Sequence, residues 1–362
     1  MKVLYIITGL AQGGAERVVC DLADKMYEKG HQVKIVYLVG DVQTYPVNKE
    51  IELINANLTN MLSLPKVYLF LSKIIKDYRP DVVHSHMVHA NLLARLVRLI
   101  APMSKLISTA HSSNEGGTVR MLFYRITHSL ANVTTNVSRE ATLAFESKHA
   151  VPNDGMRTLY NGINLDKFKY CPHARVKLNK ELYLNEGCKV ILAVGRFSEA
   201  KNYPNLLKAI EVLKREVNYS FKLIIAGDGE LRPLLESIIK EKGLEHDVIL
   251  LGRRHDIFEL MSAADLFVLP SKYEGFGLVV AEAMACECLV VATDCGGVAE
   301  VLNNSDFLVP PSNTVALKNK MKYALELQGK EKSTVINKNL KHVRENFSLE
   351  DIIEKWTILY HE

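Results

Sequence analysis

The sequence predicts an α/β protein with parallel sheets covered by helices, divided into two domains. Short apolar segments alternate with longer segments of helical pattern along the whole chain, which is typical of parallel sheets. The chain has 362 residues, more than one core usually serves, and 48% of them are hydrophobic. Glycine-containing turns follow several predicted strands, where open α/β sheets bind their ligands.

In the first half, Lys2 is followed by an apolar run that gives way to Glu16 and Arg17. The run is short and lacks a cleavage-like stretch, so we interpret it as a first strand and not as a signal peptide. A helix is expected at 14–29, closed by Gly30. Strands are expected at 2–8, 32–39, 81–84, 105–110 and 131–137.

The second half repeats the pattern more clearly. Strands are expected at 189–194, 221–226, 247–251, 265–269, 289–293 and 307–309, and helices at 203–217, 230–242, 256–263, 278–286, 297–302 and 313–327. The weakly patterned stretch 152–188 contains the expected crossover. The predicted domains are therefore 1–165 and 166–345, with a helix at 346–362 that packs back on the first domain.

Composition limits the class of protein. The net charge is +4, and the stretch 58–130 carries nine basic and three acidic residues, so positive charge concentrates in the first half. The six cysteines form no Cys-x-x-Cys pair or zinc-like spacing, which favours reduced thiols and a cytoplasmic location. No run of 18 apolar residues predicts a transmembrane helix.

Two cations follow the predicted strand 189–194. Gly195-Arg196 ends the strand and Lys201-Asn202 comes five residues later. Arginine grips phosphate in a fork and lysine supplies a point charge, so this pair suits a diphosphate. The alternative is a solvated loop with surface cations. Gly227-Asp228-Gly229, after the next strand, is interpreted as a sharp structural turn.

The most specific segment runs from Pro270 to Gly277 and leads into an apolar helix. Glu274 lies on the loop and Glu282 inside the helix. Helical side chains lean towards the N-terminus, so Glu282 can reach back to a ligand held by the loop, and carboxylates accept hydrogen bonds from sugar hydroxyls. Gly275 and Gly277 let backbone amides face that ligand. The alternative is a surface glutamate and a chance helical one.

In the first half, Gly13-Gly14 follows the first strand and opens a helix, where it could bind an anion or simply form a tight turn. His111 follows the strand 105–110. His84, His86 and His89 lie nearby without a clear partner in the sequence, which leaves a metal cluster as a weak alternative.

Together these segments resemble the retaining glycosyltransferases of family 4. The resemblance covers almost the whole chain and rests on Gly13-Gly14-Ala15-Glu16, Asn161-Gly162-Ile163, Gly195-Arg196 with Lys201-Asn202, Gly227-Asp228-Gly229, Leu251-Gly252-Arg253, and Glu274-Gly275-Phe276-Gly277 with Glu282-Ala283-Met284. It implies the GT-B fold, in which two Rossmann-like domains have parallel sheets facing a deep interdomain cleft. One departure is Asn164, where an aspartate is common.

The resemblance also implies roles. The catalytic residues would be His111, Arg196, Lys201 and Glu274, and the two cations would neutralise the donor diphosphate. The donor-binding residues would be Gly14, Arg196, Lys201, Asn202, Gly227, Arg253, Glu274, Gly275, Phe276, Gly277, Leu278 and Glu282. Gly13, Gly14 and His111 would lie on the acceptor side. No cofactor or metal would be required, and the sequence has no Asp-x-Asp.

The expected activity is transfer of a hexose or N-acetylhexosamine from a UDP-sugar to a polyprenyl-diphosphate-linked saccharide, in O-antigen, lipopolysaccharide or other surface polysaccharide biosynthesis. Three basic amphipathic stretches, Leu62–Lys76, Leu92–Leu106 and Val119–Leu130, with Arg95 and Arg98 in the second and Arg120 and Arg125 in the third, predict peripheral contact with an anionic membrane.

Three other functions explain less of the sequence. The chain could be an NAD(P)-dependent oxidoreductase with Asp41 after the second strand, but this leaves Arg196, Lys201, Glu274 and Glu282 unexplained. It could be a non-catalytic sensor of sugar nucleotides. Nucleic-acid binding is poorly supported because the basic residues lack interleaved aromatics.

Overall fold

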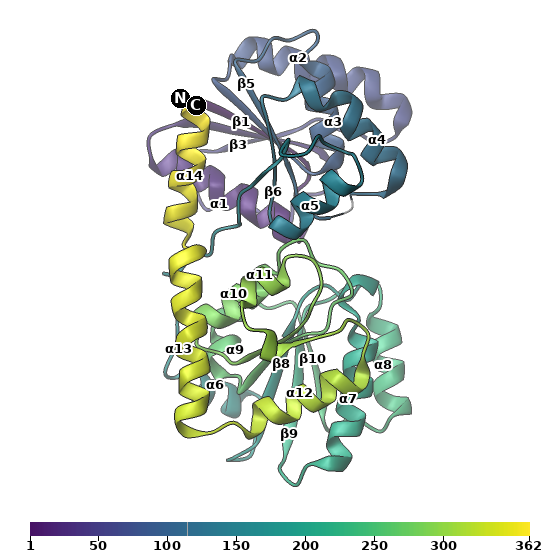
Figure 1. The fold of residues 1–362 in the computed structure, drawn as a ribbon, viewed down its shortest axis with the longest axis vertical. Helices are drawn as coiled ribbons and strands as arrows, with labels where there is room; N and C mark the ends of the chain where they lie inside the picture. Colours follow the sequence, from purple (N-terminus) through teal and green to yellow (C-terminus); the bar gives the residue numbers. More distant parts are fainter. Residues whose placement is uncertain (114) are drawn as a thin grey trace. The chain divides into compact units, whose positions relative to one another are not determined.

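The computed structural model describes residues 1–113 and 115–362, which form two compact units (Figure 1). Unit 1 consists of Met1–Gly162 and Glu350–Glu362, and unit 2 of Ile163–Leu349. Each unit contains a parallel sheet with helices packed against it. The predicted α/β class with two parallel-sheet domains is confirmed.

In unit 1 the described strands form a sheet in the order β3-β2-β1-β4-β5-β6-β7. Two short strands at the sheet edges, β3 and β7, were not predicted. The strands are β1 (Lys2–Gly9), β2 (Gln32–Val39), β3 (Glu52–Asn55), β4 (Val82–His86), β5 (Lys105–Ala110), β6 (Val133–Asn136) and β7 (Arg157–Thr158). The strand order reverses between the central strands β1 and β4, so their carboxyl ends form a topological switch point.

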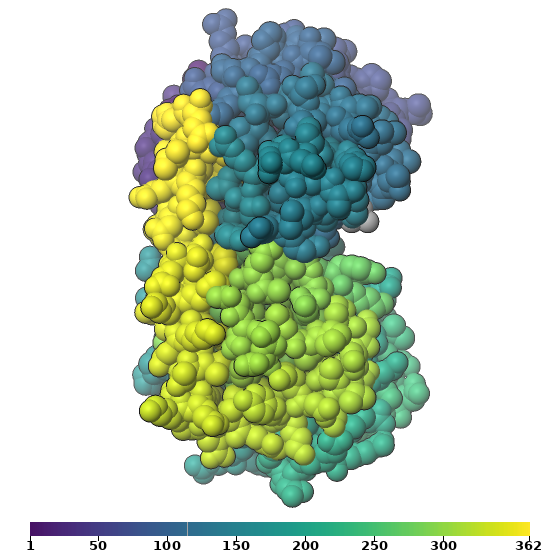
Figure 2. Space-filling view, in the orientation of Figure 1, coloured from purple at the N-terminus to yellow at the C-terminus, as the bar shows by residue number. Residues whose placement is uncertain are grey.

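The helices of unit 1 are amphipathic and bury one face on the sheet. They are α1 (Gly14–Glu28), α2 (Leu64–Tyr78), α3 (Val88–Val97), α4 (Gly117–Thr127), α5 (Arg139–Ser147) and α14 (Leu349–His361), with short 3₁₀ turns at η1 (Met61–Ser63) and η2 (His128–Leu130). Figure 2 shows α14, in yellow, running along this unit, to which residues 350–362 belong. Its Trp356 ring lies 4.5 Å from the ring of His84.

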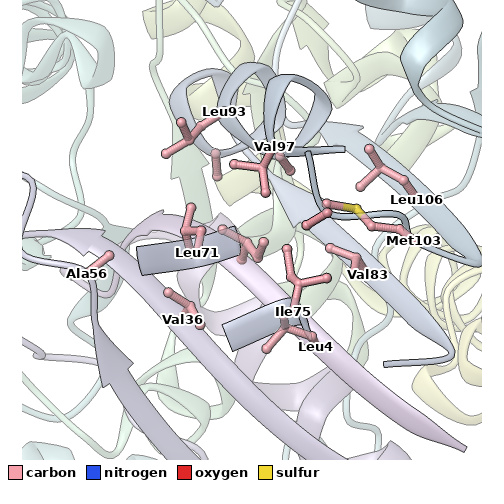
Figure 3. Packing of buried hydrophobic residues seen from close by; sticks show 14 of the residues in the cluster. Leu4, Val36, Ala56, Leu71, Ile75, Val83, Leu93, Val97, Met103 and Leu106 are labelled. Atoms are coloured by element: carbon pink, nitrogen blue, oxygen red, sulfur yellow. The ribbon is translucent and has the colours of Figure 1, made fainter. Parts of the chain in front are cut away.

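The core beneath α2 and α3 is a close-packed aliphatic cluster (Figure 3). It joins β-branched and leucine side chains of the strands to the buried faces of both helices, and includes Leu4, Val36, Ala56, Leu71, Ile75, Val83, Leu93, Val97, Met103 and Leu106. Burial of these side chains fixes the helices against the sheet at about 25 cal/mol per Å². This packing fixes the positions of the strands, and with them the polar residues that follow at the carboxyl ends.

Unit 2 repeats the arrangement with strand order β10-β9-β8-β11-β12-β13 among its described residues. Its strands are β8 (Lys189–Val194), β9 (Phe221–Ala226), β10 (Val248–Gly252), β11 (Leu266–Leu269), β12 (Val290–Thr293) and β13 (Leu308–Val309). Its helices are α6 (Ala174–Glu181), α7 (Tyr203–Glu216), α8 (Arg232–Glu241), α9 (Ile257–Ala263), α10 (Leu278–Ala285), α11 (Val298–Leu302), α12 (Thr314–Glu326) and α13 (Gly329–Asn346), with 3₁₀ turns at η3 (Glu199–Lys201) and η4 (Ser305–Phe307). The order reverses between β8 and β11.

Candidate functional site

Two predicted site residues meet across the switch point of unit 2. Lys201 follows β8 and Glu274 follows β11, and the two strands are neighbours. Lys201 Nζ donates to Glu274 Oε1 at 2.5 Å, and the buried Ser271 hydroxyl donates to the same oxygen at 2.7 Å. The side chains of Lys201 and Glu274 are 19% and 13% exposed, so a ligand can reach both. A cation beside a carboxylate can hold a phosphate and a hydroxyl of one ligand.

Glycines let the neighbouring strand ends approach closely. Gly195 and Gly227 have φ of +153° and +150°, in a region that favours glycine. A Cβ on Gly227 would lie 1.9 Å from the carbonyl oxygen of Gly195. The Phe197 N–H donates to the Asp228 carbonyl at 3.0 Å. The turn at Gly227 thus supports the loop that leads to Lys201, in keeping with the structural turn expected there.

The loop that carries Glu274 is supported from the other side by the turn after β12. Gly296 has φ +55°, and a Cβ there would lie 1.9 Å from the carbonyl oxygen of Glu274. The Gly297 N–H donates to the Gly275 carbonyl at 3.2 Å. The Thr293 hydroxyl donates to the Ser271 carbonyl at 2.7 Å. Neighbouring backbone therefore fixes the position of Glu274.

Helix α10 starts where this loop ends. Gly277 precedes it with φ +91°, and Phe276 is buried against Phe347, with ring centroids 5.3 Å apart. Leu278 and Glu282 are partly buried on α10. The N-terminus of α10 carries partial positive charge, which can stabilise a negatively charged group placed there.

The other predicted donor-binding residues lie on turns of the same unit. Arg196 and Arg253 are exposed after β8 and β10, strand ends that flank Gly227. Asn202 is buried instead, and its amide donates to Ser312 Oγ at 3.2 Å. Its φ of +51° places it at the turn before α7, so packing accounts for its position.

In unit 1 the predicted glycine loop follows β1. Gly13 has an extended backbone, and α1 begins at Gly14. A Cβ on Gly13 would lie 2.4 Å from Glu16 Oε2, so the glycine leaves room for that buried carboxylate. The Thr44 hydroxyl donates to the Ala11 carbonyl at 2.7 Å and anchors the loop.

The histidines of unit 1 have partners that the sequence did not reveal. His84 Nδ1 lies 2.6 Å from the Tyr360 hydroxyl, and its Nε2 lies 2.7 Å from Thr109 Oγ1. His86 Nδ1 lies 3.0 Å from His111 Nε2. The rings of His84 and His86 are 4.0 Å apart. A stacked, hydrogen-bonded group thus connects α14 to the strand ends at His111.

Burial governs protonation in this group. It lowers the pKa of His111 to about 4 and holds the pKa of His84 and His86 well below the usual histidine value. All three rings are therefore neutral near pH 7. Among the described residues, no group of three or more His, Cys, Asp or Glu side chains is arranged to hold a metal ion.

A partly buried carboxylate beside His111 was missed by sequence reasoning. Glu115 accepts the His111 backbone N–H at 2.8 Å and the Tyr124 hydroxyl at 2.5 Å. Burial raises the pKa of Glu115 to about 7. Tyr124 also accepts a hydrogen bond from Asn91 at 2.8 Å. A glutamate four residues after a strand-end histidine was the available signal.

One arginine of the predicted membrane-facing stretches lies in the interior instead of on the surface. Arg95 is fully buried and donates to Ser108, Thr127 and Thr134, so it cannot contact a membrane. The prediction was wrong because α3 turns this position towards the sheet. Across residues 1–113 and 115–362, each helix is too short or too polar to cross a bilayer.

Comparison with known families and proteins accounts for both units. Residues 12–167 match the family model described as Glycosyltransferase Family 4, and residues 175–343 match Glycosyl transferases group 1. The chain is 25% identical to N-acetyl-alpha-D-glucosaminyl L-malate synthase of Bacillus anthracis, over 97% of this chain and 94% of that protein. It is 26% identical to a Campylobacter jejuni N-acetylgalactosamine-N,N'-diacetylbacillosaminyl-diphospho-undecaprenol 4-alpha-N-acetylgalactosaminyltransferase, over 90% of each.

A solved structure has the same fold. The crystal structure of Anabaena Alr3699/HepE in complex with UDP superposes with a TM-score of 0.85 and 22% sequence identity, covering 99% of each chain.

Proposed function

Because this chain belongs to the GT-B glycosyltransferases that join a family 4 half to a group 1 half, we propose that it transfers a hexose or N-acetylhexosamine from a UDP-sugar to a lipid-linked saccharide. The observation that carries the proposal is the contact between Lys201 and Glu274 across the switch point of unit 2. The product would enter a surface polysaccharide such as an O-antigen.

Catalysis in this proposal is electrostatic. Breaking the bond between the sugar and the diphosphate places negative charge on the departing nucleotide. Lys201 meets that charge, and Arg196, exposed after the same strand, adds a second cation. These two side chains would supply the positive charge that a divalent ion supplies in other transferases.

Glu274 would then bind the sugar. One oxygen of its carboxylate accepts hydrogen bonds from both Lys201 and Ser271. When a diphosphate takes up the charge of Lys201, the carboxylate becomes available to a sugar hydroxyl. Since no carboxylate is assigned as a nucleophile, we propose retention by attack on the face from which the nucleotide leaves.

The choice of donor follows from the relatives. One is named for N-acetylglucosaminyl and another for N-acetylgalactosaminyl transfer, and the Anabaena structure contains UDP. We therefore propose a UDP-N-acetylhexosamine. The Campylobacter protein is named for an undecaprenol-linked acceptor, which favours a polyprenyl-diphosphate acceptor here. We assign the acceptor side to Gly13, Gly14 and His111.

A lipid-linked acceptor calls for contact with a membrane, and the outer face of α4 has the composition for it. Val119, Leu122, Phe123 and Ile126 are 67%, 55%, 47% and 62% exposed, and Arg125 is exposed among them. Helix α3 packs on α4, and its Leu96 and the turn that follows it, with Leu99 and Ile100, are also exposed. Apolar side chains with cations suit an anionic lipid surface, and a protein working there would be peripheral and cytoplasmic.

Vesicle binding tests this face. The wild-type protein should sediment with phosphatidylglycerol vesicles and less so in high salt, and Leu122→Glu should abolish sedimentation. Leu234→Glu, on α8 in unit 2, changes a residue of similar exposure (47%) and should leave it intact. Equal sedimentation of the two variants would remove α4 from the interface.

A nucleotide panel and one variant test the activity. UDP or a UDP-sugar at about 100 times its Kd should stabilise the protein by about 2.7 kcal/mol, and NAD(P)H should not. Lys201→Ala should abolish both the UDP shift and transfer. Lys272→Ala removes a lysine of the Glu274 loop that pairs with Glu199, and it should preserve both. Wild-type transfer by Lys201→Ala would exclude this site.

A further inference from the structure

His86 is the last residue of β4 and is fully buried, with its ring packed against those of Tyr5 and His84. One ring nitrogen, Nδ1, lies 3.0 Å from His111 Nε2. The other, Nε2, has no hydrogen-bond partner within the described part of the chain. A buried ring with one occupied and one unpaired nitrogen is an unusual arrangement, since buried polar atoms are nearly always paired.

The contact between the two histidines contains a single proton. Both rings are neutral at pH 7 because burial lowers the pKa of each. A neutral imidazole has one donor and one acceptor nitrogen, so one ring donates and the other accepts. Two arrangements are possible. One leaves an N–H without an acceptor at His86 Nε2, and the other leaves a lone pair without a donor there.

If His111 donated, His86 would accept at Nδ1 and would carry its own proton on Nε2. That N–H would be buried without an acceptor, and orphaned buried N–H groups are rare in native structures. If His86 donates from Nδ1, its Nε2 is a bare lone pair, and a missing acceptor contact is better tolerated. The second arrangement is therefore favoured.

His111 then has a defined tautomer. Its Nε2 accepts from His86, so its proton lies on Nδ1, which is the ring nitrogen left for a ligand. An N–H donor suits a sugar hydroxyl or phosphate oxygen, and it cannot remove a proton from an acceptor hydroxyl.

We propose that His86 is a positioning residue that holds His111 in the Nδ1–H tautomer, so that His111 donates a hydrogen bond to an oxygen of the bound sugar substrate. The assignment of the ligand rests on the proposed function, whereas the direction of the hydrogen bond between the two histidines does not.

NMR of the wild-type protein labelled with ¹⁵N-histidine measures that direction without any substrate. The signals of His111 are identified by their loss in His111→Gln. We expect a proton with its one-bond coupling to His86 Nδ1 and a smaller coupling across the hydrogen bond to His111 Nε2. His84, whose nitrogens contact hydroxyls, should show no nitrogen–nitrogen coupling and serves as an internal control. A one-bond coupling on His111 Nε2 would overturn the proposal.

An acceptor-only residue at position 86 tests the consequence. His86→Asp should move the proton of His111 to Nε2 and lower kcat at least tenfold. If His111 kept its proton on Nδ1 in this variant, His86 would not determine the tautomer. If the proton moved and kcat did not change, His111 would not donate to the substrate, although UDP binding by unit 2 would stand.

Discussion

Replacing Gly296 with alanine tests whether the site depends on the close approach between the Glu274 loop and the turn after β12. A Cβ at Gly296 would lie 1.9 Å from the carbonyl oxygen of Glu274, whereas real Cβ contacts essentially never fall below 3.0 Å. The carbonyl must therefore retreat by about 1 Å. Since Lys201 Nζ lies 2.5 Å from Glu274 Oε1, a retreat of that size strains or breaks their hydrogen bond.

The expected loss follows from this displacement. A shift of about 1 Å near the reacting groups costs on the order of 100-fold in rate, which corresponds to about 2.7 kcal/mol of transition-state stabilisation. The left-handed backbone costs alanine a further 1–2 kcal/mol of folding stability, roughly. We expect kcat/KM to fall about 100-fold while Tm falls by only a few degrees.

Gly243→Ala is the matched control. Gly243 has φ +61°, close to the +55° of Gly296, but a Cβ there meets nothing within 4 Å. This variant should lose similar stability and keep wild-type kcat/KM. Rates of UDP release and thermal melts of the two variants separate the backbone cost from the clash. If Gly296→Ala were as active as Gly243→Ala, the close approach would not position Glu274.

Three further predictions concern the polar core of unit 1. The pKa of Glu115 is raised to about 7, so its protonation stabilises the fold fully below pH 4.5, and this contribution disappears as pH rises to 7. In denaturant melts between pH 5 and 8, the unfolding free energy of Glu115→Gln should therefore fall by about 2 kcal/mol less than that of the wild type. His111, whose pKa is lowered to about 4, has the opposite sign: neutral His111 stabilises the fold above pH 6.5 and this is lost as pH falls towards 4, so His111→Gln should flatten the acid limb by about 2 kcal/mol. Tyr360→Phe leaves His84 Nδ1 buried without its partner and should cost about 1–3 kcal/mol of unfolding free energy, whereas Tyr323→Phe, half exposed, should change it by less than about 0.5 kcal/mol.

The regular elements could be predicted because each is encoded locally. Strands such as β8 and β9 show unbroken apolar runs, and the bounds expected for both agree with the structure. Among the helices of the first 162 residues, bounds were predicted only for α1, and none for α2 to α5. The short edge strands β3 and β7 and helix α6 were missed because two to eight residues carry little periodic signal. Their positions depend on pairing with distant segments.

Some residues of the candidate site could be predicted from the sequence, and others could not. The strand-end positions of Lys201 and Glu274 followed from the pattern, because parallel strands bring their carboxyl ends to one edge of the sheet. The partner of His84 could not be predicted, since Tyr360 lies 276 residues later in the sequence. Arg95 was placed on the surface because its neighbours alternate charge with leucine, and only packing shows which side of α3 faces inward.

Residues 350–362 belong to unit 1 although the other part of that unit ends at Gly162. During translation, the first 162 residues therefore leave the ribosome long before the segment that supplies Trp356 and Tyr360 exists. Until then, Tyr5 and His84 lack the contacts that Tyr360 and Trp356 make with them. Deletion of residues 350–362 should therefore destabilise unit 1, which contains the first 162 residues, and not unit 2.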